Sequence, residues 1–269
     1  MFSLYGLVIL VGLVVGSFLN VCIYRIPRGQ SVVYPRSSCP NCNSPIRILE
    51  NIPILSYLVL RGKCRQCGTK ISWIYPLVEG LTAILFCLLF IKYALLFPFF
   101  LNAIFFSILV ILIFIDLSER LLPDICTLGG VAFGFVMAPL QSGEFFSDVS
   151  LINLQGVLMR YCYSLLGILM GAGILWLVGE IYLRVKKVQG IGFGDIKMMA
   201  MVGAFLGWQH TWLTIVLGSL FGALIGSFYI YFQEKGIKYE LPFGSFLAVA
   251  AIISTLCGTQ IISAYLGQF

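Results

Sequence analysis

Charged side chains are scarce in this chain. Of its 269 residues, 10% are Asp, Glu, Lys or Arg, whereas 60% are hydrophobic, and the mean hydropathy is +1.00. That composition leaves too little polar surface to cover a water-soluble globule. The apolar residues come in blocks close to the roughly 20 residues that a helix needs to cross a bilayer. We therefore predict an all-α integral membrane protein that is embedded in a lipid bilayer.

Eight apolar stretches predict about eight transmembrane helices, at about 3–24, 75–91, 97–116, 125–140, 161–183, 196–209, 212–232 and 243–266. Because no Lys or Arg precedes Arg25, we expect the N-terminus outside the cell membrane. Alternating crossings then put 15 of the 17 Lys and Arg residues in loops on the inside and both termini outside. This bias accounts for the net charge of +6, which does not indicate a nucleic-acid partner.

Glycines recur at four-residue spacing within several of these stretches, for example at Gly12/Gly16 and Gly167/Gly171. In membrane helices, small residues at this spacing let two backbones approach closely. We interpret these glycines as helix-packing positions without a catalytic role.

The nine cysteines do not indicate a disulfide framework, because five are scattered through apolar stretches. The other four form two C-x-x-C pairs in the polar segment 25–74, Cys39/Cys42 and Cys64/Cys67. Two such pairs with 21 residues between them are typical of a tetrahedral zinc site. A location in the cytoplasm would keep the thiols reduced, which favours zinc over disulfides. We predict a structural Zn²⁺ in a cytoplasmic loop domain, since four sulfur ligands leave no open coordination position. The alternatives are a redox pair or unrelated free thiols.

Acidic residues are also few, and two of them stand at the ends of apolar stretches. Asp116 ends one stretch and Asp195 opens another, so the predicted topology puts both at the cytoplasmic end of the helices. Two neighbouring carboxylates share one proton, which suits aspartyl proteolysis: one takes a proton from water while its protonated partner polarises the scissile carbonyl. From the residues alone, the alternatives are helix capping, a water-facing position, or a proton pathway in a transport protein.

Four motifs occur in the order in which one family carries them. They are the segment 16–27 (GSFLNVCIYRIP), the four cysteines, the L-P-D that ends at Asp124, and G-x-G-D-x-K at 192–197. Over essentially the whole chain, this set resembles the bacterial type IV prepilin (leader) peptidase family, within the G-x-G-D membrane aspartyl proteases. The resemblance implies that Asp116 and Asp195 are catalytic and that Asp124 supports them. Lys197, on another side of the helix, is expected to anchor to lipid headgroups.

The resemblance also implies substrates and a location. The enzyme would remove the basic leader of type IV prepilins or type II secretion pseudopilins after a glycine, at the cytoplasmic face of the bacterial inner membrane. It would then N-methylate the new N-terminus with S-adenosylmethionine. Residues 1–92, which hold the first two spans and the zinc loop, would form the methyltransferase-type region, and residues 93–269, with six spans, the peptidase core.

Methyl transfer itself cannot be derived from a motif, because no S-adenosylmethionine fingerprint is recognisable. Glu50 and Glu79 are the only acids before residue 93, so they are candidates to orient or deprotonate the amine, but each can instead pair with a loop arginine. Gly62 resembles a glycine that the family uses for methylation, although it can simply be a turn residue. The functional alternatives are a peptidase that has lost methylation, a proton-coupled transport protein, and a zinc-dependent scaffold.

Overall fold

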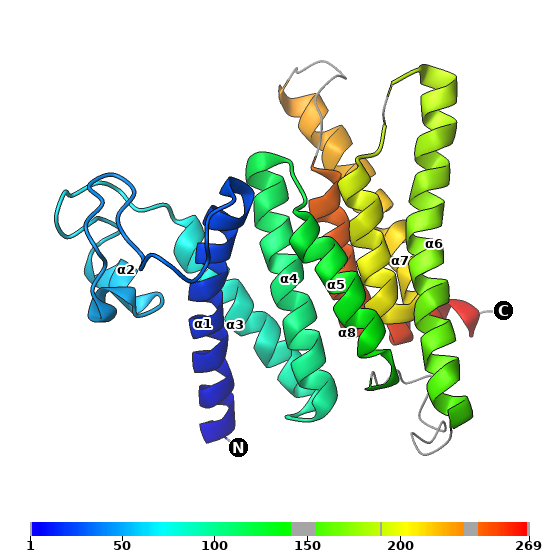
Figure 1. Cartoon of the computed structure of the whole chain (residues 1–269), viewed down its shortest axis with the longest axis horizontal. Coiled ribbons are helices and arrows are strands. Elements are labelled where there is room, and N and C mark those ends of the chain that lie inside the picture. The colour runs from blue at the N-terminus through cyan, green and yellow to red at the C-terminus, as the bar shows by residue number, and fades with distance from the viewer. Residues whose placement is uncertain (1, 141–153, 189, 234–241, 268–269) are drawn as a thin grey trace. The chain divides into compact units, whose positions relative to one another are not determined.

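The structure, a computed structural model, describes residues 2–140, 154–188, 190–233 and 242–267 (Figure 1). This part of the chain is helical; it contains two isolated β-bridges and no strand. Six of its helices are long and apolar enough to cross a membrane. The predicted all-α membrane class is therefore confirmed. The chain forms two compact units, Met1–Ile111 and Leu112–Phe269, which divide within helix α4 (Phe97–Glu119).

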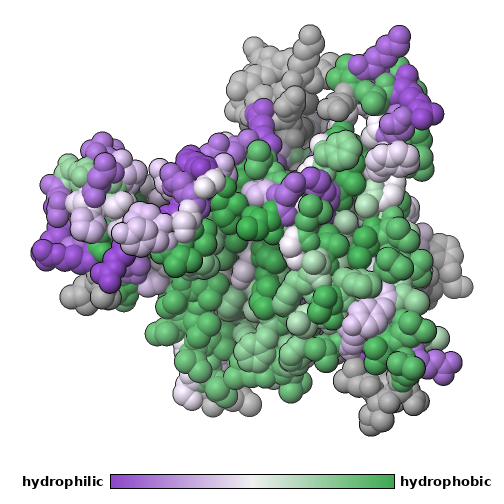
Figure 2. All heavy atoms as spheres, in the orientation of Figure 1, coloured by the Kyte–Doolittle hydropathy of each residue, from purple (hydrophilic) through white to green (hydrophobic). Residues whose placement is uncertain are grey.

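The first unit contains two long helices joined by the polar loop. Helices α1 (Phe2–Arg25) and α3 (Ile74–Tyr93) pack against each other. The loop between them contains the short helices η1 (Ile26–Arg28), η2 (Ile48–Asn51) and α2 (Leu55–Val59). Hydrophilic residues gather on this loop, whereas the visible helix surfaces are largely hydrophobic (Figure 2).

Glycines of α1 set the contact with α3. A Cβ on Gly12 would lie 2.6 Å from the Ala83 Cα, and one on Gly16 would lie 2.7 Å from the Glu79 Cα. Any larger residue would push the two helices apart, so these glycines are packing positions, as their spacing predicted. Large apolar side chains such as Leu10, which is 60% exposed, remain uncovered on α1, which fits contact with lipid.

The second unit contains the end of α4 followed by α5 (Asp124–Val136), η3 (Ala138–Leu140), α6 (Leu154–Lys186), α7 (Phe193–Gln233) and α8 (Phe243–Leu266). Helices α6 and α7 make the most extensive contact, and α7 also packs on α5 and α8. Gly167 of α6 lies directly against Gly203 of α7. Two glycines facing each other allow this close approach.

Helix α7 reverses direction at Gly207, whose φ of 71° and ψ of 178° are not helical. A Cβ on Gly171 would touch both the Met199 carbonyl and the Thr211 side chain. These two residues would be about 18 Å apart on a straight helix. The halves of α7 therefore correspond to the predicted spans 196–209 and 212–232. With α5 as a shorter apolar helix, the helices account for all eight predicted apolar stretches.

Candidate active site and metal centre

Asp116 lies in the last turn of α4 and is buried, with 6% of its surface exposed. Its Oδ2 accepts two hydrogen bonds from Ser245, one from the backbone N–H at 2.7 Å and one from the hydroxyl at 2.8 Å. Ser245 stands in the first turn of α8, where backbone N–H groups have no acceptor within the helix. Asp116 therefore satisfies the N-terminus of α8 from a neighbouring helix, at the end where the helix dipole favours negative charge.

Asp195 lies in the first turn of α7 and is half-buried. Its backbone N–H donates to the Gly192 carbonyl at 3.1 Å, which closes the turn that leads into the helix. A Cβ on Gly244, at the start of α8, would lie 2.9 Å from Asp195 Oδ1 and 3.2 Å from Asp116 Oδ2. One oxygen of each carboxylate thus lies within 3.2 Å of the same point beside Gly244, although the two residues are 79 positions apart in the sequence.

An apolar side chain and an ion pair lie at the same end of the second unit as the aspartates. The apolar side chain is that of Leu122, which a Cβ on Gly194 or Gly244 would touch. The ion pair joins the first turns of α7 and α5, where Lys197 Nζ donates to Asp124 Oδ1 at 2.7 Å. Sequence reasoning did not anticipate this partner for Lys197, and the contact of Lys197 with lipid headgroups stays a prediction.

The four loop cysteines form one cluster in the first unit. Their sulfurs all lie within 4.8 Å of one another, and those of Cys39 and Cys67 are 3.8 Å apart. Zinc–sulfur bonds of about 2.3 Å in a tetrahedron put neighbouring sulfurs about 3.8 Å apart, so the donor set and its spacing fit zinc. No disulfide joins the cysteines in the described residues.

Both C-x-x-C pairs are shaped by the same turn. In each pair the first cysteine carbonyl accepts from the backbone N–H four residues later, that of Asn43 at 2.8 Å and that of Gly68 at 3.0 Å. Both of these residues have positive φ, 53° and 69°, which Asn and Gly tolerate better than other residues. The repeated turn brings the sulfurs of both pairs into one cluster.

Hydrogen bonds favour the thiolate form at two of the four cysteines, Cys42 and Cys67. Hydrogen bonds from the Thr69 hydroxyl and backbone to the sulfur lower the pKa of Cys67 to about 6. A hydrogen bond with the Ser44 hydroxyl at 2.9 Å lowers the pKa of Cys42. Because the thiolate is the form that binds a metal, these contacts prepare the cluster for zinc at neutral pH.

Two sequence-family models match the chain in succession: the Bacterial Peptidase A24 N-terminal domain over residues 10–93 and the Type IV leader peptidase family over residues 103–227. Proteins named prepilin leader peptidase/N-methyltransferase are similar over nearly the full length. The one from Aeromonas hydrophila is 36% identical over 98% of this chain and 94% of its own length. Those from Legionella pneumophila and Pseudomonas aeruginosa are each 34% identical, over 99% and 96% of this chain and 96% and 92% of their own lengths.

The chain belongs to the type IV leader peptidase family. The resemblance inferred from the four motifs is thereby confirmed. No solved structure matches the chain significantly.

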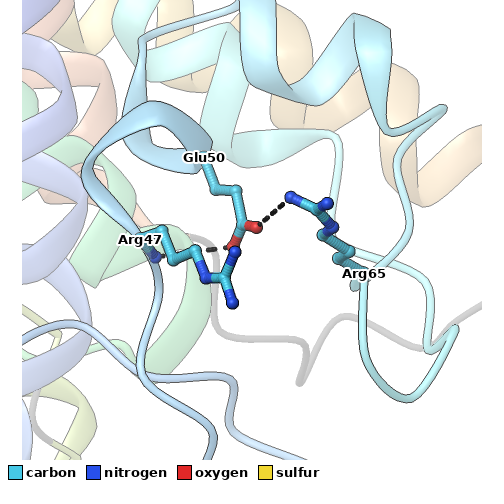
Figure 3. A network of polar contacts seen from close by, with 3 residues as sticks. All are labelled: Arg47, Glu50 and Arg65. Atoms are coloured by element: carbon cyan, nitrogen blue, oxygen red, sulfur yellow. Dashed lines mark hydrogen bonds and ion pairs between the residues drawn. The ribbon is translucent and has the colours of Figure 1, made fainter.

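In this leader peptidase, Glu50 is paired with arginine. Arg65 Nη1 lies 2.9 Å from Glu50 Oε1, and the backbone N–H of Arg47 donates to Oε2 at 3.4 Å (Figure 3). These contacts lower the pKa of Glu50, chiefly through the hydrogen bond from Arg65. The three residues line a cavity of about 220 Å³ that also reaches Cys39 and Cys64.

Glu79 and Gly62 occupy structural positions in the same unit. Glu79 is buried in α3 and accepts a hydrogen bond at 2.8 Å from the backbone N–H of Ile54, so it ties the loop to the helix. Gly62 has a φ of 64°, and a Cβ on it would lie 3.0 Å from the Tyr57 ring. It is a turn residue two positions before Cys64, the first residue of the second cysteine pair.

Sequence reasoning missed Gly244 and Ser245, which touch the aspartates most closely. The available signal was the start of the last apolar stretch, where Pro242 precedes them. A proline just before an apolar stretch marks a helix N-terminus, whose free N–H groups need an acceptor. Nothing in the sequence indicates that the acceptor is Asp116, because that contact depends on how α4 and α8 pack.

Proposed function

We propose that this chain is a membrane aspartyl endopeptidase that removes the basic leader of type IV prepilins or type II secretion pseudopilins after a glycine. It then methylates the new N-terminus with S-adenosylmethionine. The observation that supports this function best is the convergence of Asp116 and Asp195 at Gly244, in a chain whose relatives are named prepilin leader peptidase/N-methyltransferase.

Peptide cleavage follows from a carboxylate pair that holds one proton. The charged carboxylate takes a proton from water while the water oxygen forms a bond to the scissile carbonyl carbon. The protonated partner gives its proton to the carbonyl oxygen. When the carbon–nitrogen bond breaks, a proton passes to the leaving amine, which becomes the new N-terminus of the pilin. The hydroxyl formed from the carbonyl oxygen returns its proton, which restores the pair.

The proposed setting is the bacterial inner membrane, with the active site at the cytoplasmic face. Support comes from the basic residues, 15 of which fall on the inner side when the crossings alternate. A pilin's hydrophobic helix can then lie in the bilayer while its leader extends to the ends of α4, α7 and α8. In this proposal residues 93–269 form the peptidase core and residues 1–92 the methyltransferase-type region. The successive family matches at 10–93 and 103–227 support that division.

In the proposed methyltransferase region, Cys39, Cys42, Cys64 and Cys67 hold a structural Zn²⁺. S-Adenosylmethionine supplies the methyl group when it is bound. The cavity between Arg47, Glu50 and Arg65 offers opposite charges for the carboxylate and ammonium groups of its methionyl part. We propose that Glu50, Gly62 and Glu79 shape this site. Glu50 lines the cavity, whereas Gly62 and Glu79 hold the loop in position.

The test is an incubation of purified protein with a prepilin, in which wild type is compared with Asp116→Asn and Asp195→Asn. We expect wild type to cleave after the leader glycine and both variants to be inactive, because an amide neither accepts nor donates the shared proton. Glu180→Gln is the matched control and should still cleave, since Glu180 pairs with Arg184 within α6. Cleavage that persists in either of the first two variants would remove that residue from the pair.

Methylation is measured separately by mass spectrometry of the cleaved product with S-adenosylmethionine present. We expect one added methyl group on the new N-terminus. A product that stays unmodified would show a peptidase without methyl transfer.

A further inference from the structure

The two aspartates have unequal surroundings. Asp116 Oδ2 accepts two hydrogen bonds from Ser245, from its backbone N–H and its hydroxyl, whereas the Asp195 carboxylate has one donor, the backbone N–H of Gly192. The Ser245 hydroxyl also lies 3.3 Å from the Ile113 carbonyl, but its contact with Asp116, at 2.8 Å, is the shorter. Each contact joins α8 to α4, so Ser245 fixes the Asp116 carboxylate with a side-chain donor that Asp195 lacks.

Hydrogen-bond donors favour the charged form of a carboxylate, and a buried carboxylate without donors favours the neutral form. Ser245 gives Asp116 a backbone N–H and a hydroxyl at the positive end of α8. Asp195 stands in the first turn of α7, whose dipole favours its charge in the same way, but it has one backbone donor, Gly192, and no hydroxyl. Since two adjacent carboxylates do not both ionise readily, the single proton of the pair will reside on the carboxylate with fewer hydrogen-bond donors.

We propose that Ser245 is a positioning residue that keeps Asp116 charged, which makes Asp116 the general base and Asp195 the general acid. This inference rests on the proposed peptidase function. Asp116 takes the proton from water as the oxygen–carbon bond forms, and Asp195 gives its proton to the scissile carbonyl oxygen. Afterwards the proton on Asp116 passes to the leaving amine, and the tetrahedral hydroxyl returns a proton to Asp195 as the carbonyl reforms.

Among the described residues, the other charged groups at this end do not reverse the asymmetry. From α7, Asp195 faces Asp116, and Lys197 is engaged with Asp124 of α5 at 2.7 Å. From α4 itself, Glu119 and Arg120 follow Asp116 by one turn, with opposite charges. Helix α8 brings no titratable group in its first turn. The donors of Ser245 therefore remain the main difference between the two carboxylates.

The test is the pH dependence of kcat/KM for prepilin cleavage, in wild type, Ser245→Ala and Ser245→Thr. The acidic limb of this profile reports protonation of the general base. Ser245→Ala keeps the backbone N–H but removes the hydroxyl, so we expect the acidic limb to move to higher pH and kcat/KM below that limb to fall about tenfold. Ser245→Thr restores the hydroxyl and should restore the limb. The matched control is Ser164→Ala, which removes a buried hydroxyl that donates to the Ala204 carbonyl at 2.9 Å.

Three results would overturn the inference. An unchanged limb in Ser245→Ala would show that the hydroxyl does not support the charge on Asp116. A limb that moves to lower pH would show that the hydroxyl accepts a proton from neutral Asp116. A fall in the kcat/KM of Ser245→Ala that is equal at every pH and is not reversed in Ser245→Thr would show that Ser245 has a structural role alone. Failure of the wild type to cleave any prepilin would instead refute the proposed function, so the two failures are distinguishable.

Discussion

Gly244 has no side chain, so the space beside its Cα, next to the two carboxylates, stays open. A Cβ there would lie 2.9 Å from Asp195 Oδ1 and 3.2 Å from Asp116 Oδ2. A methyl group would therefore separate the carboxylates or occupy the position of the attacking water. Displacing reacting groups by about 1 Å can cost about 100-fold in rate, so we expect Gly244→Ala to lower kcat/KM for prepilin cleavage by about that factor. Purified variant and wild type are compared at the same pH.

The matched control for this substitution is Gly222→Ala. A Cβ on Gly222 would meet its nearest atoms, ring carbons of Phe243 and Phe246, at 3.6 Å, which is an ordinary contact. We expect this control to cleave at nearly the wild-type rate and to unfold at a similar temperature. If Gly244→Ala also cleaves normally, the carboxylates do not use the space in front of Gly244.

Sequence reasoning singled out residues whose type is rare in an apolar chain or whose spacing forms a motif. It missed residues of common type whose contacts depend on how the helices pack. Asp116 and Asp195 stand out because carboxylates are costly at the edge of an apolar stretch. The cysteines stand out by their spacing. Gly244 and Ser245 are common residues for a membrane helix, and their importance comes from the close approach of α8 to α4. The contact between Lys197 and Asp124 was missed for the same reason, because the two residues are 73 positions apart in the sequence.

At the scale of elements, we expect the order of the cysteine loop to depend on a bound metal. Its helices η2 and α2 contain four and five residues, and its two β-bridges are isolated. A loop of this kind buries too little apolar surface to fold alone, so zinc would supply most of its folding free energy. The spacing of the cysteines predicted this centre. How the loop is fixed to α3, through Glu79 and the backbone of Ile54, could not be predicted, because Glu79 has no partner nearby in sequence.

Removal of zinc should therefore loosen the loop first. We expect chelation, or Cys39→Ser, to raise the rate of trypsin cleavage at exposed Lys63 and Arg65 about tenfold or more, since the metal-free loop loses its fold. The aspartate contacts all lie within the second unit, so prepilin cleavage should persist after the loop has opened. Peptide mapping over time measures the first effect, and an activity assay on the same samples measures the second.

Added zinc should reverse the effect of the chelator but not that of Cys39→Ser. Trypsin cleavage that proceeds at the same rate with and without metal would contradict a structural zinc centre.

At the scale of the whole molecule, the number of crossings depends on α7. Its 41 residues would extend about 62 Å as one straight helix, whereas the hydrocarbon core is about 30 Å thick. Apolar length alone cannot distinguish one long tilted helix from two short ones. Sequence reasoning separated the two halves because a model with seven spans would put half of the chain on the wrong side of the Lys/Arg bias. The structure supplies the reversal itself, at Gly207.

This reversal predicts where reporter domains fused to the chain will function. Alkaline phosphatase folds only outside the inner membrane, whereas green fluorescent protein fluoresces when it stays in the cytoplasm. We expect active phosphatase when it is fused after Gln209, and fluorescence when green fluorescent protein is fused after Lys187 or Gln233. The physical reason is that basic residues before α7 hold that end inside, and the turn at Gly207 brings the chain to the opposite face. Inactive phosphatase after Gln209, together with fluorescence of green fluorescent protein fused there, would mean that α7 does not cross the membrane twice. A single crossing by α7 would put Asp195 and Ser245 on opposite faces of the membrane, whereas their shared site requires both on the same face.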